Sequence, residues 1–122
     1  MNKAKLQKIG LWVLQIFLAL TFGPVGFSKL SDHGSWPSQF RQWGYPEHFY
    51  LAVGIAELLG GMALLLPRTA GCGAMLLMVV MGGATVHHLR RHEVNASLSV
   101  IILFALLTIV AYARRPAFFR RQ

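Results

Sequence analysis

The chain has 122 residues, of which 55% are hydrophobic and only 13% are charged. This composition excludes a soluble domain of the same size, because a small domain keeps much of its surface in water and cannot bury so many apolar side chains. The net charge of +8 does not indicate a nucleic-acid-binding protein either, because the basic residues flank apolar blocks and leave no room for a recognition fold.

The apolar residues are grouped in four blocks, which predict an all-α membrane protein. Each block has roughly 17 to 19 residues. At about 1.5 Å per residue, such a helix matches a hydrocarbon core about 30 Å thick. We therefore expect a single domain that is an antiparallel transmembrane four-helix bundle. Its helices are expected at about 9–29, 48–66, 70–90 and 95–113.

The first helix is expected to end in the sequence GFSKL, whose Lys29 has two alternative positions. The side chain could extend outward to the lipid headgroups, as lysines near helix ends commonly do. It could instead turn inward toward Glu57, across a difference in backbone level of about 10 Å that two long side chains or a water can bridge. A bend at Pro24 would shorten that distance.

Residues 31–47 form a polar stretch between the first two helices. Within it, Trp36, Phe40 and Trp43 recur at spacings that place them on one face of a short amphipathic helix. We expect this helix to lie on the outer membrane surface. Its aromatic face would serve either as an anchor in the headgroup layer or as a lid on the bundle.

Glu57 is the one charged residue in the apolar run 49–66. Glycines recur on its helix face, and glycine lines are where membrane helices approach closely, so the carboxylate is expected to face protein. A charge near the middle of the bilayer costs at least about 2.5 to 3.5 kcal/mol, so the group must be paired, hydrated or protonated. It is either a structural contact satisfied by the Thr21 hydroxyl at the same depth or a binding group paired with Lys29.

Most of the other polar side chains in the expected spans belong to the outer half of the bundle, so a site would open outward. The predicted ligand-binding residues are Glu57, Lys29, Thr21, Thr85, His87 and His88.

A metal site is the weaker interpretation of the histidines. His88 and His92 have the i, i+4 spacing that places two imidazoles on one face if the helix continues. Together with Glu93, His33 or His48 they could hold zinc or copper, but the donor set is incomplete. The alternative is a group of interfacial histidines among arginines.

The distribution of basic residues predicts the orientation in the membrane. Eight lysines and arginines fall on the side of the two termini and four on the opposite side. By the positive-inside rule, both termini are expected to be cytoplasmic, in a bacterial inner membrane. Residues 114–122 then form a basic, aromatic tail that binds anionic lipid.

Four stretches carry a family resemblance: GFSKL, then WGYP, then VGIAELLGGMALLLPR, and finally MGGATVHHL. In this order they resemble the DoxX-like family of small four-helix membrane proteins, over roughly residues 10–112. The resemblance implies a four-helix transmembrane bundle. Its name-giving member is similar to a subunit of a thiosulfate:quinone oxidoreductase, and other relatives act with redox partners or in membrane-protein assembly.

The resemblance therefore implies two functions. The first is a small accessory subunit of a quinone-linked membrane redox system, with a quinone as the suggested cofactor. The second is a non-enzymatic scaffold or assembly factor that binds other membrane proteins or a second copy of itself. With one cysteine and no complete cofactor ligand set, the chain is not expected to be an enzyme on its own.

Overall fold

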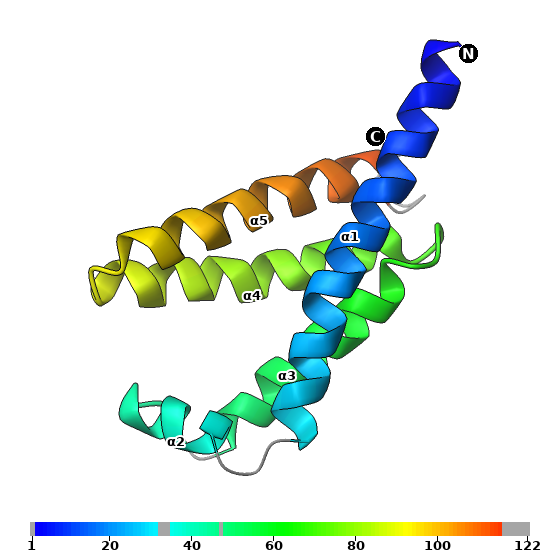
Figure 1. The fold of residues 1–122 in the computed structure, drawn as a ribbon. Helices are drawn as coiled ribbons and strands as arrows, with labels where there is room; N and C mark the ends of the chain where they lie inside the picture. The colour runs from blue at the N-terminus through cyan, green and yellow to red at the C-terminus, as the bar shows by residue number, and fades with distance from the viewer. Residues whose placement is uncertain (1, 32–34, 47, 116–122) are drawn as a thin grey trace.

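The computed structural model describes residues 2–31, 35–46 and 48–115, which contain five α-helices and no strand. His33 and the part of the basic tail from residue 116 onward lie outside this range. The helices, drawn in Figure 1, are α1 (Lys3–Ser31), α2 (Ser35–Gln42), α3 (Phe49–Ala63), α4 (Ala70–Arg90) and α5 (Val94–Ala113).

Helices α1, α4 and α5 are each long and apolar enough to cross a membrane. Helix α3 has 15 residues and is also strongly apolar, but it is shorter than the 48–66 helix expected from the sequence. It ends at Ala63 because Pro67, four residues later, has no backbone N–H to donate to the Ala63 carbonyl. The Thr69 hydroxyl donates to the Ala63 carbonyl at 2.8 Å and closes the turn into α4.

Glycines allow α1 and α3 to pack closely in opposite directions. A Cβ added at Gly26 would lie 2.6 Å from the Leu58 nitrogen and 2.7 Å from the Gly54 oxygen, and one added at Gly61 would lie 3.0 Å from the Gly23 nitrogen. These neighbours are backbone atoms, which cannot rotate away. Only glycine at Gly26 permits this approach.

The apolar core lies where the four long helices meet, around Leu18, Leu64, Leu77, Leu107 and Val110, all of which are fully buried. Leu77 of α4 fits against Gly60 of α3, where an added Cβ would lie 2.6 Å from the Leu77 Cγ. From this end, the α4–α5 pair and the α1–α3 pair diverge toward α2 (Figure 1). The described contacts thus establish two helix pairs joined at one end, and the closed four-helix bundle predicted from the sequence is not confirmed.

A buried glutamine ties the helices together at the closed end. Gln15 is fully buried; its Nε2 donates to the Leu64 carbonyl at 2.8 Å, and its Oε1 accepts from the Arg114 Nε at 2.9 Å. The Arg114 guanidinium also lies 5.5 Å from the centre of the Trp12 ring. Gln15 therefore connects α1 to the end of α3 and to the end of α5.

We predict that Gln15→Leu lowers the free energy of unfolding by about 1 to 3 kcal/mol, because it leaves the buried Leu64 carbonyl without a donor. Denaturant titration in detergent micelles measures this change. The matched control is Ser99→Ala, since that exposed hydroxyl donates within α5, to the Asn95 carbonyl, and its loss should change stability by less than about 0.5 kcal/mol. Equal stability of Gln15→Leu and the wild type would contradict the structural role of Gln15.

Large apolar side chains cover the outside of the long helices. Leu20 on α1 is 69% exposed, and Ile102 on α5 is 59% exposed. Contiguous apolar surface of this kind is unusual on soluble monomers but suits the hydrocarbon region of a bilayer. The surface therefore agrees with the apolar helices in indicating a membrane protein.

Candidate functional site

A buried ion pair joins the last turn of α1 to the middle of α3. The Lys29 Nζ lies 2.7 Å from the Glu57 Oε1, and the two residues are only 6% and 4% exposed. Lys29 therefore turns inward, which was one of its two predicted positions, and does not extend to the headgroups. A charged pair withdrawn from solvent is costly unless its geometry is close, which this distance provides.

The glycine packing of α1 against α3 brings the two charges together. A Cβ at Gly54 would lie 2.8 Å from the Lys29 Cβ, and one at Gly26 would lie 3.1 Å from the Glu57 carbonyl carbon. The two backbones thus touch beside the ion pair. Lys29 is therefore level with Gly54, less than one helical turn from Glu57, and its side chain reaches the carboxylate directly.

Trp36 of α2 covers the lysine. The Lys29 Nζ lies 4.2 Å from the centre of the Trp36 ring, and the Trp36 Nε1 donates to the Ser28 Oγ at 3.1 Å. The hydrogen bond fixes the ring over the ammonium group, where a cation–π contact adds to the ion pair. The sequence did not predict the contact of Trp36 with Lys29 or its hydrogen bond to Ser28, because the helical spacing only placed Trp36 on the aromatic face of an amphipathic helix.

Phe40 is the centre of an aromatic cluster that connects α2 to α3. It is 6% exposed, and its ring centre lies 5.3 Å from that of Trp43 and 5.6 Å from that of Tyr45. Trp43 in turn lies 4.4 Å from the His87 ring of α4. Among the predicted headgroup anchors, Phe40 thus packs against Phe49 and Tyr50 of α3, and Trp43, the residue after α2, packs against α4.

Tyr45 links the same cluster to α4 by a hydrogen bond. Its hydroxyl lies 2.9 Å from the His87 Nδ1. The chain reaches this position through Gly44, whose φ of +87° lies in the left-handed region that favours glycine. The sequence WGYP signals a turn here, but nothing in the pattern identified the partner of Tyr45.

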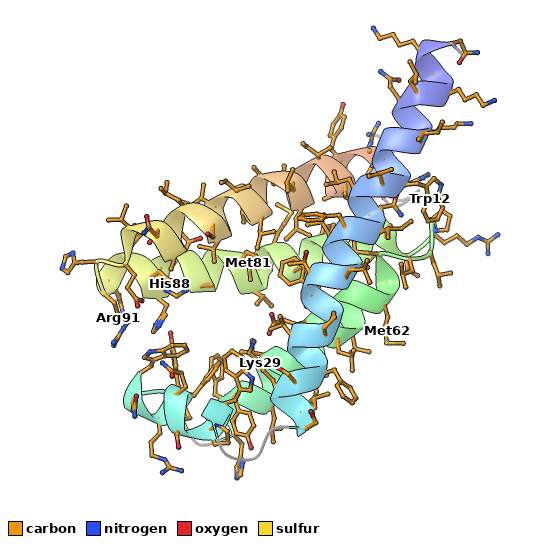
Figure 2. All side chains as sticks on the ribbon, viewed as in Figure 1. Trp12, Lys29, Met62, Met81, His88 and Arg91 are labelled. Carbon is orange, nitrogen blue, oxygen red and sulfur yellow. The ribbon has the colours of Figure 1, made fainter. Side chains whose placement is uncertain are left out.

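A cavity of about 660 Å³ lies between α3 and α4 beneath α2, and we call it the α3–α4 cavity. Figure 2 shows Lys29 on one side of the opening and Met81 and His88 of α4 on the other. Its apolar and aromatic lining includes Trp36, Phe40, Trp43, Tyr45, Phe49, Ala52, Val53, Ala56, Leu76, Val79, Val80, Met81, Gly83, Ala84 and Val100. Its charged and titratable lining residues are Lys29, Glu57, His87 and His88.

Two of the predicted ligand-binding residues, Thr21 and Thr85, lie outside the lining of the α3–α4 cavity. The Thr21 hydroxyl donates to the Phe17 carbonyl and the Thr85 hydroxyl to the Met81 carbonyl, each at 2.8 Å within its own helix. Thr21 is therefore not the partner of Glu57, and no hydroxyl or backbone N–H in the described ranges donates to the Glu57 Oε1.

The histidine pair expected at His88 and His92 is not formed, because α4 ends at Arg90 and His92 has a φ of 58°. The His88 Nδ1 instead lies 2.9 Å from the Glu93 Oε1. That hydrogen bond, followed by the charges of His88 and Arg91, holds the pKa of the Glu93 carboxyl below its usual value. Ligand atoms of His87, His88 and Glu93 all lie within 4.8 Å of one another.

Comparison with known proteins gives a family match over most of the chain. The model described as the DoxX-like family matches residues 13–111. This range contains every residue of the ion pair, the α3–α4 cavity and the histidine cluster. No curated protein and no solved structure matches the chain.

Proposed function

Because this chain belongs to the DoxX-like family, we propose that it is an accessory subunit of a membrane redox system whose α3–α4 cavity binds a quinone-like molecule. The observation that carries the proposal is the Lys29–Glu57 ion pair at the side of a cavity whose lining is mostly apolar and aromatic. Small-molecule sites commonly have this character, with apolar walls and a few polar groups that fix orientation.

The size and chemistry of the cavity suit a flat ring that carries oxygen atoms and an apolar tail. Its volume of about 660 Å³ lies within the roughly 300 to 1,000 Å³ typical of ligand sites. The Lys29 ammonium has three N–H donors, so it can hold Glu57 and still donate to a carbonyl oxygen. Trp36 and Trp43 offer faces for stacking on the ring.

Leu76, Val79 and Val80 extend the lining along α4 and would contact the apolar tail. Burial of each methylene group of such a tail contributes about 0.8 kcal/mol. A ligand with both a polar ring and an apolar tail therefore uses the whole cavity, whereas a purely polar ligand would leave most of the lining unused.

We also propose that the chain crosses a bacterial inner membrane four times, with α3 as the shortest span and both termini in the cytoplasm. The start of α1 and the end of α5 lie on the side away from α2 (Figure 1), together with the N-terminal lysines, Arg68 and Arg114. This distribution of charge supports the orientation. The α3–α4 cavity then opens near the outer surface, beneath α2.

The proposal is tested by tryptophan fluorescence of the purified chain in nanodiscs, titrated with a short-chain ubiquinone. Trp36 and Trp43 line the cavity, whereas Trp12 packs against Arg114 at the other end. We predict saturable quenching in the wild type and in Trp12→Phe, and none above the collisional background in Trp36→Phe/Trp43→Phe. Quenching that does not saturate in the wild type, or that persists with Trp12 alone, would contradict the proposal.

A scaffold that binds other membrane helices is the second candidate function. It is favoured by the divergence of the two helix pairs (Figure 1) and by Gly83 of α4, where an added Cβ would meet nothing within 4 Å. Small residues on an open face allow another helix to approach closely. Quinone titration together with cross-linking distinguishes this function, because a scaffold that binds only helices would be cross-linked to a defined protein partner in intact membranes and would show no saturable tryptophan quenching by the quinone.

A further inference from the structure

The turn after α4 brings a carboxylate back onto a histidine. The Glu93 N–H donates to the His88 carbonyl at 3.0 Å, and the His92 N–H donates to the Leu89 carbonyl at 3.1 Å. Together with the left-handed φ of His92, these two bonds form a Schellman motif, a common helix C-terminus. The motif fixes the backbone of Glu93 beside His88, so that the Glu93 Oε1 lies 2.9 Å from the His88 Nδ1.

His87 supplies a third donor next to this pair. The Tyr45 hydroxyl lies 2.9 Å from the His87 Nδ1, while the His87 Nε2 is buried and has no hydrogen-bond partner in the described part of the chain. A hydrogen bond at one ring nitrogen orients an imidazole and fixes which nitrogen carries the lone pair, as it does for metal-binding histidines. In the tautomer whose Nδ1–H donates to the Tyr45 hydroxyl, the lone pair of His87 lies on the unpartnered Nε2, and a metal ion bound there would select that tautomer.

We infer that His87, His88 and Glu93 bind a divalent zinc-type or copper-type cation. Two imidazoles and one carboxylate form a common ligand set for such ions and leave a fourth position open. Imidazole nitrogen favours zinc and copper over magnesium or calcium, which prefer oxygen ligands. This metal site goes beyond the proposed binding of a quinone-like molecule, because neither Glu57 nor Lys29 is a ligand of the metal ion.

The spacing of the donors suits an ion after a small side-chain movement. Their ligand atoms lie within 4.8 Å of one another, and ligands about 2.0 to 2.2 Å from one ion can be at most about 4.4 Å apart. The Glu93 side chain is 43% exposed, so its carboxylate can move toward an ion held by the two imidazoles. The competing cation is Arg91, whose Nε lies 3.7 Å from the Glu93 Oε1 and whose side chain is itself 48% exposed.

The site lies at the rim of the α3–α4 cavity, because His87 and His88 both line that cavity and Glu93 does not. This arrangement makes the two sites separable by mutation. Glu93→Gln removes a metal ligand outside the cavity, and Glu57→Gln removes a cavity carboxylate outside the metal cluster.

The test is calorimetric titration of Zn²⁺ into the full chain in nanodiscs, with Cu²⁺ electron paramagnetic resonance as a second readout. We expect one ion per chain and coupling of Cu²⁺ to two nitrogens. Removing a ligand by His88→Ala or Glu93→Gln should weaken Zn²⁺ binding by at least about tenfold. His92→Asn is the matched control, since it removes an imidazole of the same turn that does not belong to the cluster, and asparagine tolerates the left-handed backbone of this position. Its affinity should equal that of the wild type.

Absence of Zn²⁺ binding by the wild type, or an equal loss in His92→Asn and His88→Ala, would overturn the inference. Circular dichroism of each variant without metal checks that the helices are retained. A wild type that binds Zn²⁺ but shows no saturable quenching by the quinone would contradict the proposed function alone. A wild type that shows saturable quenching but does not bind Zn²⁺ would contradict the metal site alone.

Discussion

Replacing Lys29 by methionine is expected to lower the free energy of unfolding by about 3 to 5 kcal/mol, because it leaves the Glu57 carboxylate buried without its cation. Both side chains are almost completely buried, at 7% and 5% exposure, so solvent cannot replace the lost partner. Denaturant titration in detergent micelles measures the loss. Lys8→Met is the control, since Lys8 is an exposed lysine of the same helix and should change stability by less than about 0.5 kcal/mol.

Removing both charges separates the effect of pairing from that of packing. The double variant Lys29→Met/Glu57→Leu is expected to recover most of the stability lost in Lys29→Met, because two apolar groups of similar volume can replace a buried ion pair at little cost. A double variant as unstable as Lys29→Met would show that the lysine stabilises the protein by some means other than its charge.

Gly26→Ala is expected to lower the free energy of unfolding by about 1 to 3 kcal/mol. The added Cβ would lie 2.6 Å from the Leu58 nitrogen and 2.7 Å from the Gly54 oxygen. Because both are backbone atoms, α1 and α3 must separate, and this separation also pulls Lys29 away from Glu57. Denaturant titration and the affinity for the quinone should therefore change together.

Gly10→Ala is the matched control for this prediction. It makes the same change in the same helix at a position where an added Cβ meets nothing within 4 Å. Alanine is a better helix former than glycine, so this variant should be as stable as the wild type or up to about 1 kcal/mol more stable. Equal behaviour of Gly26→Ala and Gly10→Ala would refute the close packing of α1 on α3.

The sequence predicted the last two helices well because apolar block length and turn residues act locally, whereas α1 begins six residues before the expected 9–29 helix and α3 ends three residues before the expected 48–66 helix. The expected 70–90 and 95–113 helices differ from α4 and α5 by at most one residue at either end. The arrangement of the helices was not predictable in the same way. A short link forces α3 and α4 to be neighbours, but the angle between the two helix pairs depends on contacts such as Gly60 with Leu77, which no periodicity reveals.

Candidate site residues were predictable in part. The glycines beside Glu57 indicated that it faces protein, and it does so. The direction of Lys29 stayed open because a long flexible side chain at a helix end can turn either way. The His88–His92 pair of the weaker, metal-site interpretation required the helix to continue. It does not form, because a left-handed residue ends α4 and places Glu93 beside His88 instead.

The most direct test of the account is the affinity of Lys29→Met/Glu57→Leu for a short-chain ubiquinone, measured by tryptophan quenching in nanodiscs. Thr85→Val is the control, because the Thr85 hydroxyl is bound within α4 and lies outside the cavity lining. If the ion pair is the polar binding group of the cavity, the folded double variant should lose at least about tenfold in affinity, or about 1.4 kcal/mol, while Thr85→Val binds like the wild type. An unchanged affinity in the double variant would contradict the central claim that Lys29 and Glu57 bind the ligand.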